Sequence, residues 1–134
     1  MSLQAATPRL ILASQSATRA ILLRETGLRF ETRPAHVDEA EIKRSARAEG
    51  ISADDTALLL AELKAHRVAR TNPDALVIGA DQLLVCEDRW FDKPADMAEA
   101  AAQLRALRGR THPLVTAILC QRGDQRLWHH IARP

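Results

Sequence analysis

The fold begins with the run Arg9-Leu10-Ile11-Leu12-Ala13-Ser14-Gln15-Ser16-Ala17-Thr18-Arg19. Its aliphatic first half predicts a buried strand. Residues 17–26 contain good helix formers and precede a glycine, so a helix follows the strand. Ser14, Ser16 and Arg19 therefore lie where a strand leads into a helix N-terminus, whose free N–H groups suit an anion. Ser16 could equally be an ordinary N-cap and Arg19 a surface residue.

The remainder of the chain alternates between strand and helix patterns. Strands are expected at residues 28–34, 75–80, 82–86, 89–91, 114–120 and 125–131. A short helix preceded by a loop is expected within residues 35–50, followed by helices near residues 54–70 and 97–107. This order predicts an α/β domain, with a mixed central sheet flanked by helices. We expect Asp54 or Asp55 to cap the second of these helices. We expect the third to bury an apolar stripe that includes Met97 and Leu104.

Length and composition limit the function classes. The 134 residues are enough for one domain with a real core, so we expect residues 1–134 to form a single domain. A net charge of +2 without a basic block, and only 3% aromatic residues, argue against nucleic-acid partners. No segment has the pattern of a membrane span or a signal peptide. We expect a cytoplasmic protein without a membrane partner, in which Cys86 and Cys120 are free thiols.

Asp81 is the strongest single candidate for chemistry. It follows the apolar run of residues 75–80 directly, and ligands of α/β sheets bind beyond the carboxyl ends of strands. A carboxylate there could hold Mg²⁺ or activate a water molecule. It could also simply cap a turn. The neighbouring Gln82 offers an amide that could read a base edge or bond the backbone.

The three lysines differ in their surroundings. Lys43 lies in a charged stretch and is expected at the surface. Lys64 shares a helical stripe with apolar residues, so it either extends to solvent or places its ammonium in a cleft beside the core. Lys93 precedes Pro94, which stiffens the local backbone, but it could be an ordinary loop residue. Glu39 could support a metal, although most acidic loop residues are merely solvated.

Six short motifs occur together in this chain: Leu12-Ala13-Ser14-x-Ser16-x-x-Arg19, Val37-Asp38-Glu39, Glu62-Leu63-Lys64-Ala65, Gly79-Ala80-Asp81-Gln82, Asp92-Lys93-Pro94 and Leu107-Arg108-Gly109-Arg110-Thr111-His112. In this order the chain resembles the Maf-like nucleotide pyrophosphatases over essentially its whole length. The resemblance implies their inosine triphosphatase-like architecture. It also implies hydrolysis of a nucleoside triphosphate between the α- and β-phosphates, to a monophosphate and pyrophosphate.

The resemblance further implies a role for each motif residue. Ser14, Ser16, Arg19, Lys64 and Lys93 correspond to residues that bind phosphate. Asp81 corresponds to the proton acceptor that activates water. Glu39 and Asp81 correspond to carboxylates beside a divalent cation, usually Mg²⁺.

Specificity in the family tracks the positions of Thr18 and Gln82. The Asp81-Gln82 pair is similar to the branch that acts on 7-methyl-GTP. Thr18 differs from the larger residue expected beside Arg19, so we expect a modified purine triphosphate as the substrate without fixing which one.

The family's members continue past the point that corresponds to Pro134 with a second lobe, so we expect that lobe to be incomplete here. The final predicted strand has no covering helix, and the family is dimeric, so a homodimer is expected. The alternative to an enzyme is a nucleotide-binding or regulatory fragment with little activity, linked to septum formation.

Overall fold

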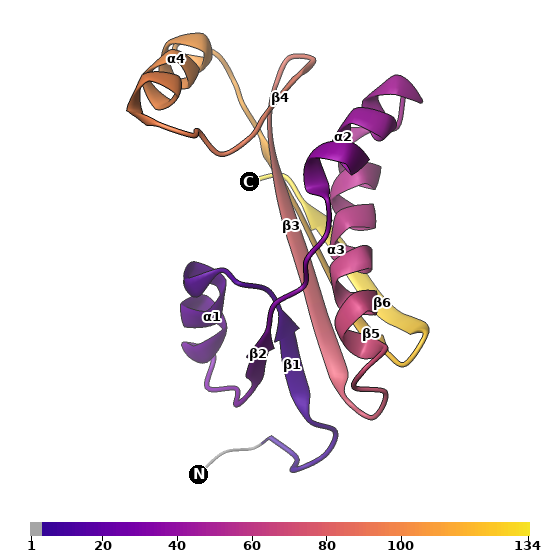
Figure 1. Cartoon of the computed structure of the whole chain (residues 1–134). Coiled ribbons are helices and arrows are strands. Elements are labelled where there is room, and N and C mark those ends of the chain that lie inside the picture. Colours follow the sequence, from indigo (N-terminus) through magenta and orange to yellow (C-terminus); the bar gives the residue numbers. More distant parts are fainter. Residues whose placement is uncertain (1–3) are drawn as a thin grey trace.

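The computed structural model describes residues 4–134, which form one mixed sheet of six strands with four helices (Figure 1). The strand order is β2-β1-β3-β5-β6, and β4 pairs with β3. The strands are β1 (Leu10–Ala13), β2 (Glu31–Arg33), β3 (Leu76–Cys86), β4 (Arg89–Phe91), β5 (Leu114–Arg122) and β6 (Gln125–Ala132). The helices are α1 (Ala17–Arg24), α2 (Glu39–Ala48), α3 (Ala53–Ala69) and α4 (Met97–Leu107). The predicted α/β class with a mixed sheet is confirmed.

Strand β3 is the axis of the molecule and connects its two ends (Figure 1). It pairs with β5 in antiparallel fashion along its length, from Leu76 opposite Arg122 to Leu84 opposite Leu114. On its other edge, β1 pairs only with residues 76–78 and β4 only with residues 84–86. Within the described chain, residues 79–83 therefore have a strand neighbour on one side alone. This free edge opens the space in which the candidate site lies.

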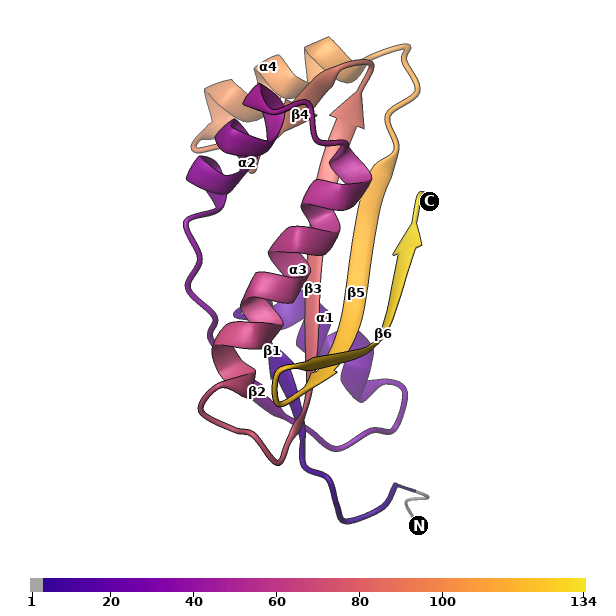
Figure 2. The same ribbon diagram turned by 90° about the vertical axis from the view of Figure 1, so that its right-hand side faces the viewer.

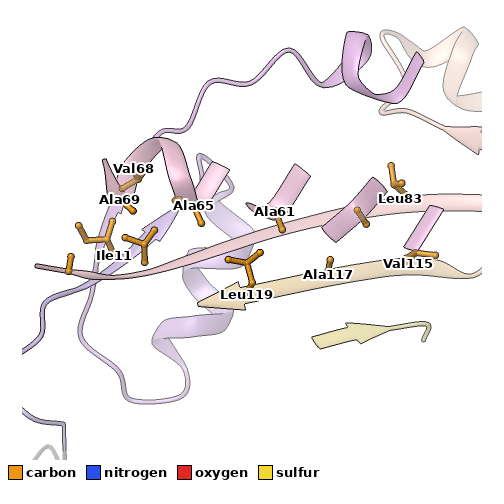
Figure 3. Packing of buried hydrophobic residues seen from close by; sticks show 13 residues of the cluster. Ile11, Ala61, Ala65, Val68, Ala69, Leu83, Val115, Ala117 and Leu119 are labelled. Atoms are coloured by element: carbon orange, nitrogen blue, oxygen red, sulfur yellow. The ribbon is translucent and has the colours of Figure 1, made fainter. Parts of the chain in front are cut away.

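Helix α3 covers one face of the sheet and runs along β3 (Figures 2 and 3). Its small side chains allow a close approach, because a Cβ on Gly79 would stand 2.2 Å from the carbonyl oxygen of Ala61 and 2.8 Å from the Cβ of Ala65. Ile11, Leu83, Val115 and Leu119 complete the main core beneath the helix. The predicted cap is wrong by a few residues: the Ser52 hydroxyl accepts a hydrogen bond from the Asp55 N–H at 3.1 Å.

Helix α1 packs on the opposite face, where Ala20 contacts Leu10, Leu12 and Ile78. Helix α4 lies at the far end of β3, beside the β3–β4 hairpin (Figure 2). The apolar stripe expected to be buried on α4 is exposed instead: Met97 is 83% and Leu104 70% accessible, and Leu107 alone is buried. The helix lies beyond the edge of the main core, so the described part of the chain supplies no surface that covers the rest of the stripe.

The edge strand β6 is mostly exposed, including Leu127 and Trp128. None of the helices formed by residues 4–134 combines the length and the apolar character that a bilayer crossing requires.

Candidate active site

The predicted site residues converge beside the free edge of β3. A cavity of about 610 Å³ there is lined by side chains from α1, α2, α3, β3 and the segment after β4. Six of the predicted residues contribute to it: Arg19, Glu39, Lys64, Asp81, Gln82 and Lys93. An adjoining cavity of about 310 Å³ shares four of these residues and adds Ser14 and Ser16. We call the two cavities together the cleft.

The loop between β1 and α1 forms one wall of the cleft. The Ser16 hydroxyl accepts a hydrogen bond from the Arg19 N–H at 3.2 Å, so Ser16 is indeed an N-cap. The Ser14 hydroxyl oxygen accepts from the Ser16 N–H at 3.1 Å and from Nη1 of Arg19 at 3.4 Å. This bond turns the guanidinium into the cleft. Among the described residues Arg19 has no acidic partner, so most of its donors are available to an anion.

Lys64 is the centre of a three-charge cluster. Its Nζ lies 2.6 Å from Oε1 of Glu39 and 2.9 Å from Oδ1 of Asp81. The Lys64 side chain is 10% and that of Asp81 5% exposed, so the lysine does not extend into bulk solvent. Each element contributes one group: α3 the ammonium, β3 the buried carboxylate, and the first turn of α2 the carboxylate of Glu39. With one cation and two anions, the cluster is net negative.

Asp81 has one oxygen that none of residues 4–134 satisfies. Oδ1 accepts the bond from Lys64, whereas Oδ2 is buried without a hydrogen-bond partner in the described chain. Burial raises the pKa of the Asp81 carboxyl, and the nearby Lys64 ammonium opposes that rise only in part. A buried, unsatisfied carboxylate oxygen at a cleft suits a water molecule or a cation supplied with a ligand.

The carboxylates also fit a Mg²⁺ ion shared with a phosphorylated ligand. Mg²⁺ usually takes one or two protein carboxylates and completes its shell with water and phosphate oxygens. Asp81 and Glu39 supply two carboxylates, which both contact the Lys64 ammonium. Residues 4–134 hold no group of three acidic, histidine or cysteine side chains placed to ligate an ion by themselves. The two carboxylates are thus the protein ligands that these residues could offer to such an ion.

The opposite wall is the segment that follows β4. Lys93 is exposed there and has no hydrogen-bond or ion-pair partner in the part of the chain that the structure describes. The residue before it, Asp92, is held twice: its carbonyl oxygen accepts a bond from Nε2 of Gln103 at 2.8 Å, and its Oδ1 lies 2.9 Å from Nζ of Lys43.

The expectation that Lys43 is a surface residue is wrong. Its side chain is 16% exposed and lines the larger cavity, because α2 presents this face toward the segment after β4. Lys43 and Asp92 are 49 positions apart, so no local pattern could reveal the contact. The scarcity of lysine in the chain was the one signal that singled out this position.

Gln82 and Asp81 are neighbours on β3 whose side chains leave opposite faces of the strand. Nε2 of Gln82 donates to Oγ1 of Thr116 at 3.1 Å on β5, directly across the ladder. Sequence reasoning missed Thr116, because the cross-strand register was unknown. Thr18 is exposed and lines neither cavity of the cleft, unlike Gln82.

Comparisons with known proteins extend this description. The chain is 53% identical over 126 residues to a protein of Granulibacter bethesdensis named nucleoside triphosphate pyrophosphatase, which covers 94% of this chain and 64% of that relative. It is 49% identical over 125 residues to the 7-methyl-GTP pyrophosphatase of Rhizobium meliloti, covering 93% and 63%. The chain thus spans slightly less than two thirds of the length of these relatives.

A solved structure of a HAM1 protein from Coxiella burnetii shares the fold, with a TM-score of 0.51 at 18% identity, over 93% of this chain and 71% of that one. Residues 9–133 match the family model described as Maf-like protein. The chain belongs to the Maf-like protein family, as its motifs predicted.

Proposed function

We propose that this chain hydrolyses a nucleoside triphosphate between its α- and β-phosphates, with release of a nucleoside monophosphate and pyrophosphate. The observation that carries the proposal concerns Oδ2 of Asp81, which has no hydrogen-bond partner among the described residues and is buried beside a lysine in a cleft lined by further cations. The names of relatives at about 50% identity support the same reaction class.

The cationic groups of the cleft suit a polyphosphate. In this proposal Arg19 offers its guanidinium fork, and Ser14 and Ser16 offer their hydroxyls. Lys93 offers an ammonium that has no partner within residues 4–134. Lys64 reaches the same cavity from helix α3, and its ammonium already neutralises part of the negative charge on Asp81. Phosphoryl transfer needs fixed charge around the phosphate oxygens and little covalent participation from the protein, which this set can provide.

Asp81 is the proposed proton acceptor. Its Oδ2 can accept a hydrogen bond from a water molecule, while Lys64 holds Oδ1 and thereby orients the carboxylate. A raised pKa makes the carboxylate a stronger base than an exposed aspartate, provided that it is ionised at the working pH. The proton of the attacking water would move to Oδ2 as the water oxygen bonds to the α-phosphorus. The bond between that phosphorus and the oxygen bridging it to the β-phosphate would break, with pyrophosphate as the leaving group.

A divalent cation, Mg²⁺ in the first instance, is part of the proposal. Asp81 and Glu39 would hold it on the protein side, because their carboxylates already lie around one positive charge. When bound, the ion would neutralise charge that develops on the phosphoryl oxygens.

For the base, we propose a modified purine such as 7-methylguanine. Gln82 lines the cleft next to Asp81, and several relatives that match this chain are named 7-methyl-GTP pyrophosphatase.

We also propose that the protein forms a homodimer. The exposed Leu127 and Trp128 on the edge strand β6 support the proposal that a second copy of the chain covers this strand. Light scattering that shows only a monomer at high concentration would contradict the homodimer.

The test is pyrophosphate release from a panel of nucleoside triphosphates that includes 7-methyl-GTP, in the presence of Mg²⁺. The proposal predicts release by the wild-type chain and none above background by Asp81→Asn. Calorimetric titration of the same nucleotides separates the alternatives. Binding without turnover would support a nucleotide-binding module in place of an enzyme, and absence of binding would refute both.

A further inference from the structure

Helix α2 presents two charged side chains to the cleft, one turn apart. Glu39 and Lys43 are four residues apart and lie on the same face of the helix. Glu39 contacts Lys64 at 2.6 Å, and both α2 side chains line the larger cavity. By contrast, Arg44, the next residue of the helix, points away: its side chain is 75% exposed and pairs with Glu41. The face of α2 with Lys43 is thus part of the site, and the face with Arg44 is not.

The ammonium of Lys43 is only partly used. It has three N–H donors, and within the described chain its one partner is Oδ1 of Asp92, at 2.9 Å. The Asp92 side chain is 72% exposed, so water competes for it and the ion pair is weak. The Lys43 side chain itself is largely enclosed. A cation enclosed at a cleft and held by an exposed carboxylate can exchange that partner for a more highly charged anion.

We propose that Lys43 is a further substrate-binding residue, which leaves Asp92 and donates to a polyphosphate oxygen when the substrate enters the cleft. Asp92 holds the ammonium in place until then. This inference rests on the proposed function, because it assumes a polyphosphate substrate. It adds a fourth cation, from α2, to Arg19, Lys64 and Lys93, which line the same cavity.

A different role for Lys43 would use the same contact. Lys43 could be a positioning residue that does not touch the ligand but fixes Asp92 and so positions the adjacent Lys93; we call this role the strut. The two roles make opposite predictions for Asp92→Asn. If Lys43 binds the ligand, loss of the competing carboxylate frees the ammonium and strengthens binding. If Lys43 is a strut, loss of the ion pair weakens binding as much as loss of the lysine. The Gln103 bond to the Asp92 carbonyl oxygen is unaffected by this substitution.

The experiment is calorimetric titration of the full chain with inorganic triphosphate in the presence of Mg²⁺. A hydrogen bond to a charged group contributes about 1.5–3 kcal/mol, so Lys43→Met should weaken binding by at least about tenfold. Lys43→Arg keeps the charge and should remain within about threefold of wild type. Asp92→Asn should tighten binding about two- to threefold. The matched control Arg44→Met, on the outer face of α2, should leave the dissociation constant unchanged.

Binding by Lys43→Met equal to that of Arg44→Met would overturn the proposal. Weakening by Asp92→Asn to the level of Lys43→Met would also overturn it, in favour of the strut. Asp92→Asn provides a second test that does not require the Lys43→Met variant to fold, and circular dichroism checks each variant. If the wild-type chain binds neither inorganic triphosphate nor the nucleoside triphosphates of the panel, the proposed function fails as well. Loss of the Lys43 effect alone leaves the proposed function intact.

Discussion

Replacement of Lys64 by methionine should destabilise the fold through the two carboxylates that it leaves behind. Oε1 of Glu39 and Oδ1 of Asp81 bond the same ammonium, so they are at most about 5.5 Å apart. At an effective dielectric constant of about 20, two unit charges at that distance repel by about 3 kcal/mol. Glu39 is partly exposed and can turn toward solvent, which relieves some of this repulsion. We expect Lys64→Met to lower the free energy of unfolding by about 1–3 kcal/mol at neutral pH.

The pH dependence of that loss follows from Asp81. Burial already raises its pKa above the ordinary value of 3.8, and removal of the Lys64 ammonium removes the main opposing influence. A group whose pKa is higher in the folded state favours folding when protonated, and this contribution is lost as pH rises through the folded pKa. The deficit of Lys64→Met relative to wild type should therefore be greatest at neutral pH and shrink as Asp81 takes up a proton.

Urea denaturation followed by circular dichroism, at neutral pH and at about pH 4, measures both quantities. Arg67→Met, on an exposed position of the same helix, is the matched control for loss of a basic side chain. The double variant Lys64→Met/Asp81→Asn should recover most of the lost stability, because one carboxylate then remains instead of two. An equal deficit at both pH values, or additive effects of the two substitutions, would refute this reasoning.

Three further predictions concern β3 and the neighbouring strand β5. Gly79→Ala should destabilise the fold by more than about 2 kcal/mol in urea denaturation, since its Cβ would stand 2.2 Å from the carbonyl oxygen of Ala61, and a cost below about 1 kcal/mol would contradict the close packing. Asp81→Asn should lose turnover yet unfold no more easily than wild type at neutral pH. The kcat/KM of the wild type should rise with pH as Asp81 loses its proton, and this rise should lie above pH 3.8, because burial raises the pKa of Asp81 from that ordinary value. Thr116→Val should release the amide of Gln82 and alter the preference among nucleobases, while the affinity for inorganic triphosphate stays the same and Thr116→Ser behaves as wild type.

The strand at the centre of the fold was readable from local sequence, but its full length was not. The apolar run at residues 75–80 predicts a strand, and residues 77–80 of β3 are buried. The pattern did not show that the strand continues unbroken through Asp81. A carboxylate at 3% exposure is tolerable there because Lys64, from a different helix, lies 2.9 Å away. Propensity cannot anticipate such compensation between distant segments.

The site was similarly readable in part. Lysine on an apolar stripe of α3 indicated that Lys64 could enter a cleft, and it is buried. Lys43 lies in a charged stretch, so its local sequence predicts a surface residue. Its surroundings in the structure depend instead on where the segment around Asp92 lies relative to α2. The apolar stripe of α4 shows the converse: periodicity predicts an apolar face, but only tertiary structure decides whether something covers it.

The most direct test of the proposed reaction is the position of the bond that water attacks. Hydrolysis of a nucleoside triphosphate in ¹⁸O-labelled water, with Mg²⁺, should yield pyrophosphate and a monophosphate in equal amounts. The label should be in the nucleoside monophosphate, and Asp81→Asn should give neither product above background. Inorganic phosphate in place of pyrophosphate, label in the pyrophosphate, or equal turnover by Asp81→Asn would contradict the role assigned to Asp81 and the cleft around it.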